Sequence, residues 1–283
     1  MVIKYEYGKK EVEACLSVLV ELMTILGEFR DNLVLVGGWI PYFLTEKNRY
    51  EHVGSLDIDI ALDFQKISGD TYKTILKILK NRGYEEGKQP FIFYRTIPIE
   101  NVGIITVEVD LLTGEYVGTG KSHRTQLIQD VRARKTRGCD LVFKQNRSLK
   151  ISANMPDGAL NEVTIKIATV VPFLIMKGMC MWDRYKEKDA YDIYFTILHY
   201  PGGINELVKI FQPFKSNKLV REGLAKIKTK FKDIDAPGPV WLINFEDIDD
   251  EEEKERVSRD AYERVNAFLD PLGIEEFKKG QED

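Results

Sequence analysis

Apolar and polar residues alternate in a way that predicts two neighbouring strands in the first quarter of the chain. Leu33–Val36 is a short apolar run that fits a buried strand. Residues 56–62 read Leu-Asp-Ile-Asp-Ile-Ala-Leu, which places Asp57 and Asp59 on one strand face and the apolar side chains on the other. A glycine pair ends the first strand, and one or two helical turns follow it.

The two carboxylates indicate a site for a divalent cation. The Cα atoms of Asp57 and Asp59 are expected to lie roughly 7 Å apart, and like charges at that spacing raise each other's pKa unless a cation joins them. Mg²⁺ prefers one or two carboxylates together with substrate phosphates. Gly37-Gly38, at the start of the short helix, presents backbone N–H groups to a phosphate. We interpret the stretch as a nucleotidyl or phosphoryl transfer site, the alternative being a solvated edge strand after an ordinary turn.

A third acid lies on another predicted strand. Residues 104–112 read Ile-Ile-Thr-Val-Glu-Val-Asp-Leu-Leu, so Glu108 and Asp110 share one face. A two-metal site needs a third carboxylate on a neighbouring strand, and either residue qualifies by its position.

The remaining periodicity predicts an α/β protein with a helical second part. Amphipathic helices are expected over residues 9–27 and 69–82, and short strands over 91–95, 139–143 and 148–153. The pattern turns helical from residue 163. Residues 155–158, Met-Pro-Asp-Gly, have turn chemistry. We therefore predict a domain with a small mixed sheet over residues 1–158 and an α-helical domain over residues 159–283.

Composition is typical of a globular protein in a reducing compartment. The 283 residues are 43% hydrophobic and 30% charged, with a net charge of -4. The three cysteines are scattered and odd in number, which favours the cytoplasm. The N-terminus lacks the apolar segment of a signal peptide, and Lys166, Pro172 and Lys177 interrupt the most apolar long stretch, so we expect no membrane partner.

Charge is unevenly distributed along the chain. Residues 121–150 hold nine Lys or Arg against two acids, which suits either an RNA backbone or triphosphate, or a solvated helix face. Residues 246–255 hold eight acids against one lysine, which fits a mobile segment or one that repels RNA. Gly120-Lys121-Ser122 imitates a P-loop, but Glu115 stands where that motif needs glycine, so a loop that brings Lys121 to a substrate is favoured.

A second charged group lies in the predicted helical part. Lys177 interrupts an apolar segment, so it either snorkels or faces a polar cleft. In a continuous helix Lys177, Arg184, Lys188 and Asp192 share one face, where a ladder of salt bridges is the alternative to a functional role.

These residues together resemble a known superfamily. Gly37-Gly38 followed by Asp57-Ile58-Asp59 resembles the nucleotidyltransferases of DNA polymerase β type. The long spacer, Ser55 two residues before the first aspartate, and the order Lys177, Arg184, Lys188-Asp189-x-x-Asp192 resemble the AbiEii-type toxin nucleotidyltransferases of type IV toxin–antitoxin systems. The lincosamide and aminoglycoside nucleotidyltransferases are also similar. The resemblance covers about residues 33–198.

The resemblance implies a Mg²⁺-dependent enzyme that moves NMP from an NTP to an acceptor hydroxyl, for an AbiEii-like toxin the 3′ end of a tRNA. It implies a cognate antitoxin protein as a partner. Asp57, Asp59 and Asp110 would hold two metal ions, with Asp110 preferred to Glu108 because two apolar residues follow it. Lys177 and Asp192 would neutralise and orient the triphosphate or base. The nucleotide-binding residues implied are Gly37, Gly38, Ser55, Arg184 and Lys188.

Three alternatives remain. A small-molecule nucleotidyltransferase needs an acceptor pocket and no basic track. A non-catalytic nucleotide or RNA binder has no need of three clustered acids. A P-loop NTPase would depend on Lys121 and release phosphate in place of pyrophosphate.

Overall fold

The computed structural model describes residues 3–45, 52–99, 103–114, 125–128 and 131–278. The chain divides into two compact units. Residues 7–40 and 54–172 form one, here called the sheet unit, and residues 1–6, 41–53 and 173–283 form the other, here called the helical unit. Each is described by itself.

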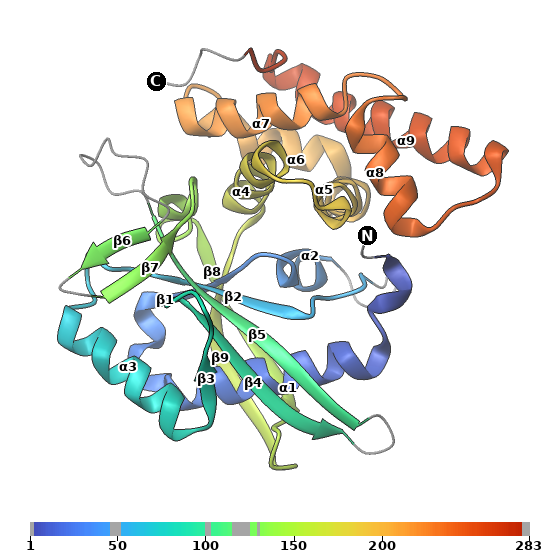
Figure 1. The fold of residues 1–283 in the computed structure, drawn as a ribbon. Coiled ribbons are helices and arrows are strands. Elements are labelled where there is room, and N and C mark those ends of the chain that lie inside the picture. The colour runs from blue at the N-terminus through green and yellow to red at the C-terminus, as the bar shows by residue number, and fades with distance from the viewer. Residues whose placement is uncertain (1–2, 46–51, 100–102, 115–124, 129–130, 279–283) are drawn as a thin grey trace. The chain divides into compact units, whose positions relative to one another are not determined.

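The sheet unit is built on a mixed sheet with nine strands among the described residues (Figure 1). The strand order is β3-β4-β5-β2-β1-β9-β8, with β7 beside β5 and β6 beside β7. Parallel pairs join β2 to β5, β1 to β9 and β5 to β7, and the other pairs are antiparallel. The strands are β1 (Leu33–Val36), β2 (Asp57–Leu62), β3 (Tyr84–Glu86), β4 (Ile92–Ile99), β5 (Gly103–Thr113), β6 (Thr125–Ile128), β7 (Val131–Lys135), β8 (Asn146–Asn154) and β9 (Leu160–Ala168).

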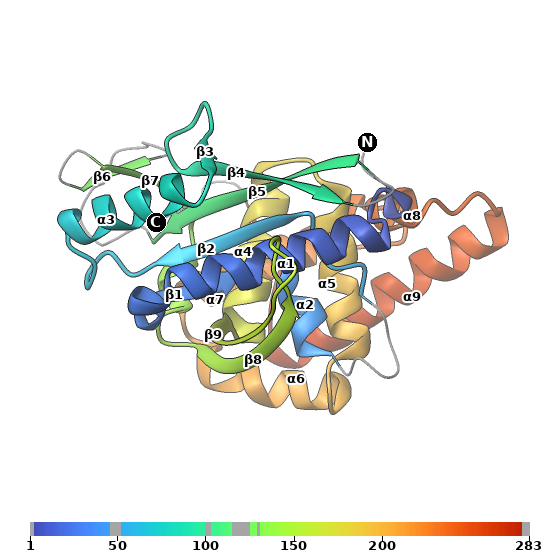
Figure 2. The same cartoon turned by 90° about the horizontal axis from the view of Figure 1, so that it is seen from below.

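Two helices, α1 (Lys9–Ile25) and α3 (Gly69–Asn81), pack on the sheet and on each other. Figure 2 shows α1 running across the strands. The buried carboxylate of Glu21 on α1 accepts hydrogen bonds from Arg82 Nε at 2.8 Å and Arg95 Nε at 2.8 Å. Burial alone would raise the pKa of Glu21, but the two guanidinium groups lower it.

This ion pair fixes which face of the sheet the helix covers. Arg95 on β4 stands opposite Val107 on β5, and opposed residues of an antiparallel pair share a face. Since Arg95 reaches Glu21, α1 covers the face of Val107 and Val109, which are buried to 1% and 0% exposure. By alternation, Glu108 and Asp110 point to the opposite face.

The helical unit is a bundle around α5 (Glu187–His199), which packs against α6 (Gly203–Phe211), α8 (Pro237–Glu246) and α9 (Glu251–Leu269). Helices α4 (Val170–Asp183) and α7 (Lys218–Lys230) complete it, and a further short helix, α2 (Trp39–Leu44), begins in the sheet unit. Fully buried phenylalanines such as Phe211, Phe245 and Phe268 fill the core. Short 3₁₀ turns lie at Lys4–Glu6, Gly27–Asn32, Cys139–Leu141, Gln212–Phe214 and Asp270–Leu272.

The predicted mixed α/β class is confirmed, but two predicted elements are wrong. Residues 139–143 are not a strand, because Gly138 adopts a left-handed conformation (φ 89°) and leads into a 3₁₀ turn. Residues 163–168 are not helical. They belong to β9, in which Ile165 and Ile167 are buried and alternate with more exposed neighbours, the period of a strand.

The division between units also differs from the predicted boundary. Residues 155–158 do form a turn, in which the Gly158 amide donates to the Met155 carbonyl at 2.8 Å, but this turn joins β8 to β9 within the sheet unit. The units divide between Pro172 and Phe173, and two N-terminal segments belong to the helical unit.

The acidic residues 246–255 mostly close α8 and open α9. Asp250 caps α9 by accepting a hydrogen bond from the Glu253 amide at 2.9 Å, and three glutamates occupy the first turn. Acids are favourable there because the helix dipole is positive at its N-terminus. Across the described residues, no helix combines the length and apolar composition that a bilayer crossing requires.

Candidate active site

Four acids lie in two register pairs on the central strands of the sheet unit. Strands β2 and β5 run parallel, with Asp57 opposite Glu108 and Asp59 opposite Asp110. Neighbouring strands are about 4.8 Å apart, and register partners point to the same face. The sheet therefore brings the predicted acids together on the face that α1 does not cover.

Tyr94 distinguishes between the two acids of β5. Tyr94 on β4 is the register neighbour of Glu108 on its other side, and its side chain is hydrogen-bonded to that carboxylate. The charge of Glu108 raises the pKa of the Tyr94 hydroxyl. Asp110 instead has apolar Ile92 as its β4 neighbour and is 6% exposed. Glu108 is thus already engaged within the sheet, which favours Asp110 as the third ligand.

The backbone around the acids is shaped to admit Asp59. Gly37 follows β1, and Val36, the last residue of β1, is the register partner of Asp59. Gly37 has φ 72°, and a Cβ atom there would lie 1.9 Å from Asp59 Oδ2. A side chain at Gly37 would displace the carboxylate. The glycine pair is therefore in contact with the acid face, with Gly38 buried behind it at the start of α2.

Ser55 and Cys15 hold the strand that carries Asp57. The buried Ser55 hydroxyl donates to Asp57 Oδ1, and Cys15 Sγ on α1 donates to the Asp57 carbonyl at 3.7 Å. Burial, then the charge of Asp57, raises the pKa of Cys15, so it stays a thiol. Of the described residues, the cysteines form no disulfide.

The fit of a metal to this face rests on the chemistry of its donors. Asp57, Asp59 and Asp110 supply hard carboxylate oxygens on one face, and Gly37 leaves the space that Asp59 occupies. Within the described part of the chain, no group of three His, Cys, Asp or Glu side chains already has a metal-holding arrangement. The residues fit Mg²⁺ in type and placement, and small side-chain rotations would be needed to converge them.

The second set of predicted residues forms a buried network in the helical unit. Lys177 Nζ on α4 lies 2.7 Å from both Asp189 Oδ1 and Asp192 Oδ2 on α5. Arg184 Nε is 3.1 Å from Asp189 Oδ2, and Lys188 Nζ is 2.7 Å from Asp192 Oδ1. Both aspartates are fully buried.

The cations keep the network ionised. Burial alone would raise the pKa of Asp192, but Lys177 and Lys188 hold it well below its usual range. Burial would lower the pKa of Lys177, but Asp189 and Asp192 raise it. With three cations against two carboxylates, the network carries one excess positive charge.

The network is not a ladder on one continuous helix. Helix α4 ends at Asp183 and α5 begins at Glu187, so Lys177 contacts Asp189 and Asp192 from the neighbouring helix. Only Lys188–Asp192 is an i,i+4 pair. All the predicted residues of this group are brought together, apart from the acids of the sheet unit.

His52 belongs to this network and was missed by sequence reasoning. Its Nε2 lies 2.9 Å from Asp192 Oδ1, and its ring stacks on Tyr191. Burial lowers the pKa of His52 to about 4, so the neutral ring donates from Nε2 to the carboxylate. No local pattern marks a histidine that tertiary packing places 140 positions from its partner.

Two predictions lie outside what the structure describes. Gly120, Lys121 and Ser122 are outside the described residues. Basic residues 132, 134 and 135 lie on β7, whose backbone alone is described.

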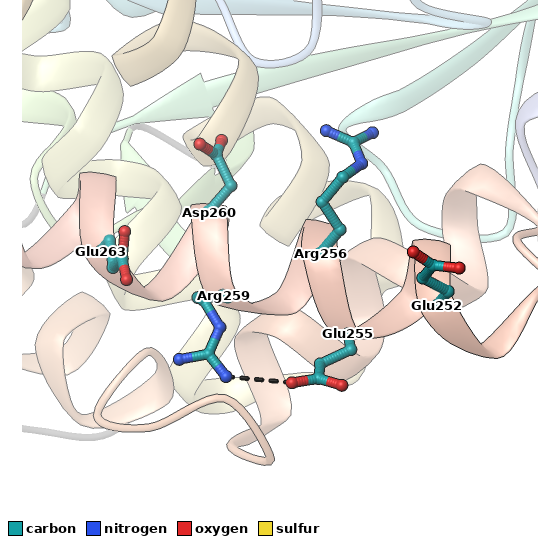
Figure 3. Close-up of a pocket in the computed structure, with 6 residues that line it drawn as sticks. All are labelled: Glu252, Glu255, Arg256, Arg259, Asp260 and Glu263. Atoms are coloured by element: carbon teal, nitrogen blue, oxygen red, sulfur yellow. Dashed lines mark hydrogen bonds and ion pairs between the residues drawn. The ribbon is translucent and has the colours of Figure 1, made fainter.

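The outer face of α9 is hollowed but chemically unpromising. Figure 3 shows six charged side chains there, from Glu252 to Glu263. Arg256 pairs with Glu253, Arg259 with Glu255, and Arg264 with Asp260 along the same helix. Neighbouring charges neutralise one another, so this surface is a solvated helix face.

Comparison with known proteins gives no family assignment: no family model matches the chain, and a search of the curated proteins finds no match.

Proposed function

We propose that the protein is a Mg²⁺-dependent nucleotidyltransferase that moves NMP from an NTP to an acceptor hydroxyl, with RNA as the acceptor. The observation that carries this proposal is the pairing of Asp59 with Asp110 on parallel strands, with Asp57 on the same face and Gly37 against Asp59. Three carboxylates on one face beside a glycine turn suit phosphoryl chemistry, which depends on positioning and charge neutralisation.

The reaction assigns a role to each acid. Asp57 and Asp59 would hold Mg²⁺, which when bound neutralises charge on the triphosphate and polarises its α-phosphorus. The acceptor oxygen forms a bond to that phosphorus while the bond to pyrophosphate breaks. The proton of the acceptor hydroxyl passes to Asp110. Ser55 keeps Asp57 oriented through its hydrogen bond.

The buried network of the helical unit fits a supporting role. Its excess positive charge favours an anion nearby, and the resemblance to AbiEii-type proteins assigns Lys177 and Asp192 to the triphosphate. The Lys177 ammonium is already shared by two carboxylates, and Arg184 is the most exposed of the three cations. We therefore expect Arg184 to meet the nucleotide and Lys177 to position it.

The acceptor is proposed from charge and resemblance. The basic stretch 121–150 supplies the cationic surface that an RNA backbone needs. A tRNA 3′ end, an antitoxin partner and a cytoplasmic location are part of the same proposal.

A transfer assay tests the proposal. The full-length protein is incubated with Mg²⁺, each α-labelled NTP in turn, and total tRNA. We expect label on RNA with one preferred NTP, release of pyrophosphate, and no transfer when EDTA replaces Mg²⁺. Release of phosphate instead of pyrophosphate would contradict the assignment, as would the absence of any transfer by a protein that folds and binds NTP. Label on a small aminoglycoside or lincosamide alone would retain the chemistry and overturn the RNA acceptor.

A further inference from the structure

Two glycines bring the helices α4 and α7 of the helical unit into close contact. A Cβ atom on Gly178 would lie 2.2 Å from the Gly223 carbonyl oxygen, and one on Gly223 would lie 3.0 Å from the Ile175 carbonyl oxygen. Such an approach is open only to glycine. One helical turn beyond this contact lie Trp182 on α4 and Lys226 on α7, and Lys230 follows after another turn of α7.

Beyond the glycine contact, aromatic rings and lysines alternate in a row. Lys226 Nζ lies 4.9 Å from the centre of the Phe277 ring and 6.0 Å from that of Trp182. Lys230 Nζ lies 5.5 Å from the Trp182 ring and 4.8 Å from the Trp241 ring. The row ends at Tyr185, whose ring meets Trp241 edge to face at 4.6 Å. We call these six residues the cation–aromatic row.

Lys230 differs from the other lysines nearby because its charge is not neutralised. Lys226 pairs with Glu222, and Lys228 with Asp270. Among the described residues, no carboxylate lies within 4 Å of Lys230 Nζ, although burial lowers the pKa of this lysine. A half-buried ammonium held between two tryptophans and left without a counter-ion favours an anion from outside the chain.

The exposed end of the row offers a stacking surface beside that charge. Tyr185 is 62% exposed, and Val240, next to Trp241, is 40% exposed. Residues 218–232, along α7 and just beyond it, hold six Lys or Arg against a single acid. An exposed aromatic ring next to an unneutralised cation on a basic helix is the combination with which proteins bind single-stranded nucleic acid, bases stacking on rings and phosphates meeting cations.

We propose that the cation–aromatic row is a docking site for single-stranded RNA, with a base on Tyr185 and a backbone phosphate at Lys230. The choice of RNA rests on the proposed function, but binding here requires neither NTP nor Mg²⁺. The surface therefore adds an acceptor-binding site on the helical unit, separate in chemistry from the acids of β2 and β5.

Fluorescence anisotropy tests this site. A labelled single-stranded RNA of about 12 nucleotides is titrated with the full-length protein in EDTA at about 50 mM and about 200 mM salt. We expect Tyr185→Ala and Lys230→Gln each to weaken binding at least about fivefold, and Lys230→Arg to retain most of the affinity. Binding should also weaken with salt and quench tryptophan fluorescence.

Matched variants control for exposure and charge. Tyr5→Ala removes a tyrosine that is 80% exposed, and Lys209→Gln removes an exposed lysine that pairs with Glu206. Each should change the affinity less than about twofold. Asp57→Asn should bind RNA like the wild type even where transfer is lost, so the two proposals fail separately. Equal effects of Tyr185→Ala and Tyr5→Ala, or no RNA binding at the lower salt concentration, would overturn the site.

Discussion

The carboxylate of Asp59 occupies the space that a side chain on Gly37 would fill. This makes one glycine responsible both for a left-handed turn and for the position of an acid. Residue chemistry on β2 is thus set by a neighbour that carries no functional group at all.

Substitution of Gly37 should separate these two effects. Gly37→Ala should destabilise the protein by at least about 1–2 kcal/mol from backbone conformation alone and abolish nucleotidyl transfer by displacing Asp59. Gly158→Ala is the matched control, because Gly158 has φ 85° with nothing within 4 Å of a Cβ atom. Urea unfolding and the transfer assay measure both. Equal activity of the two variants would show that Asp59 is not displaced or not needed.

His52 should make stability depend on pH. Its ordinary pKa is 6.5 and its folded pKa is about 4, so the unfolded chain binds the extra proton first as pH falls. Stability is complete above pH 6.5 and should fall by about 3 kcal/mol towards pH 4, at roughly 1.4 kcal/mol per pH unit.

His52→Gln tests this because it keeps an N–H donor for Asp192 but cannot titrate. Urea unfolding of both proteins across this pH range gives the comparison. The difference between wild type and variant should shrink or reverse as pH falls, and parallel pH profiles would contradict the assignment.

At the scale of elements, α4 and α5 are joined by charge in their buried contact. Lys177 is the connection, since it reaches two aspartates on the neighbouring helix. A buried ion pair adds little net stability, but removal of one partner leaves a buried charge without compensation.

Lys177→Met should therefore cost about 3–5 kcal/mol of unfolding free energy. Lys209→Met, on an exposed i,i+3 pair of α6, should cost less than about 1 kcal/mol. Urea unfolding measures both. A loss below about 1 kcal/mol for Lys177→Met would show that Lys177 is not the buried connection, and would return it to a purely nucleotide-binding role.

Local patterns predicted some elements well and missed others for physical reasons. Strict alternation identified the acid faces of β2 and β5, because side-chain direction in a strand depends on sequence parity alone. Their mutual register, which sets Asp59 opposite Asp110, depends on long-range pairing that no local pattern encodes. Strand β9 was taken for helix because its apolar end runs directly into the apolar α4.

At the scale of the whole molecule, the spacer between the glycine turn and the acid strand acquires a structural meaning. Residues 41–53 of that spacer belong to the helical unit, although the chain on either side belongs to the sheet unit. The spacer supplies His52 to Asp192, so its length is used to build the helical unit. The sequence suggested only an unusually long spacer, since unit membership follows from packing.

The most direct test of the central claim is the rate of NMP transfer by Asp57→Asn compared with Asp70→Asn. Asp57 lies on the acid face, whereas the Asp70 side chain is 90% exposed in the first turn of α3. The account predicts that Asp57→Asn loses about 10²–10³-fold or more of the rate with an unchanged urea midpoint, because charge stabilisation at the phosphate is lost. Asp70→Asn should match the wild type. Transfer by Asp57→Asn at the wild-type rate would contradict the assignment of this face as the active site.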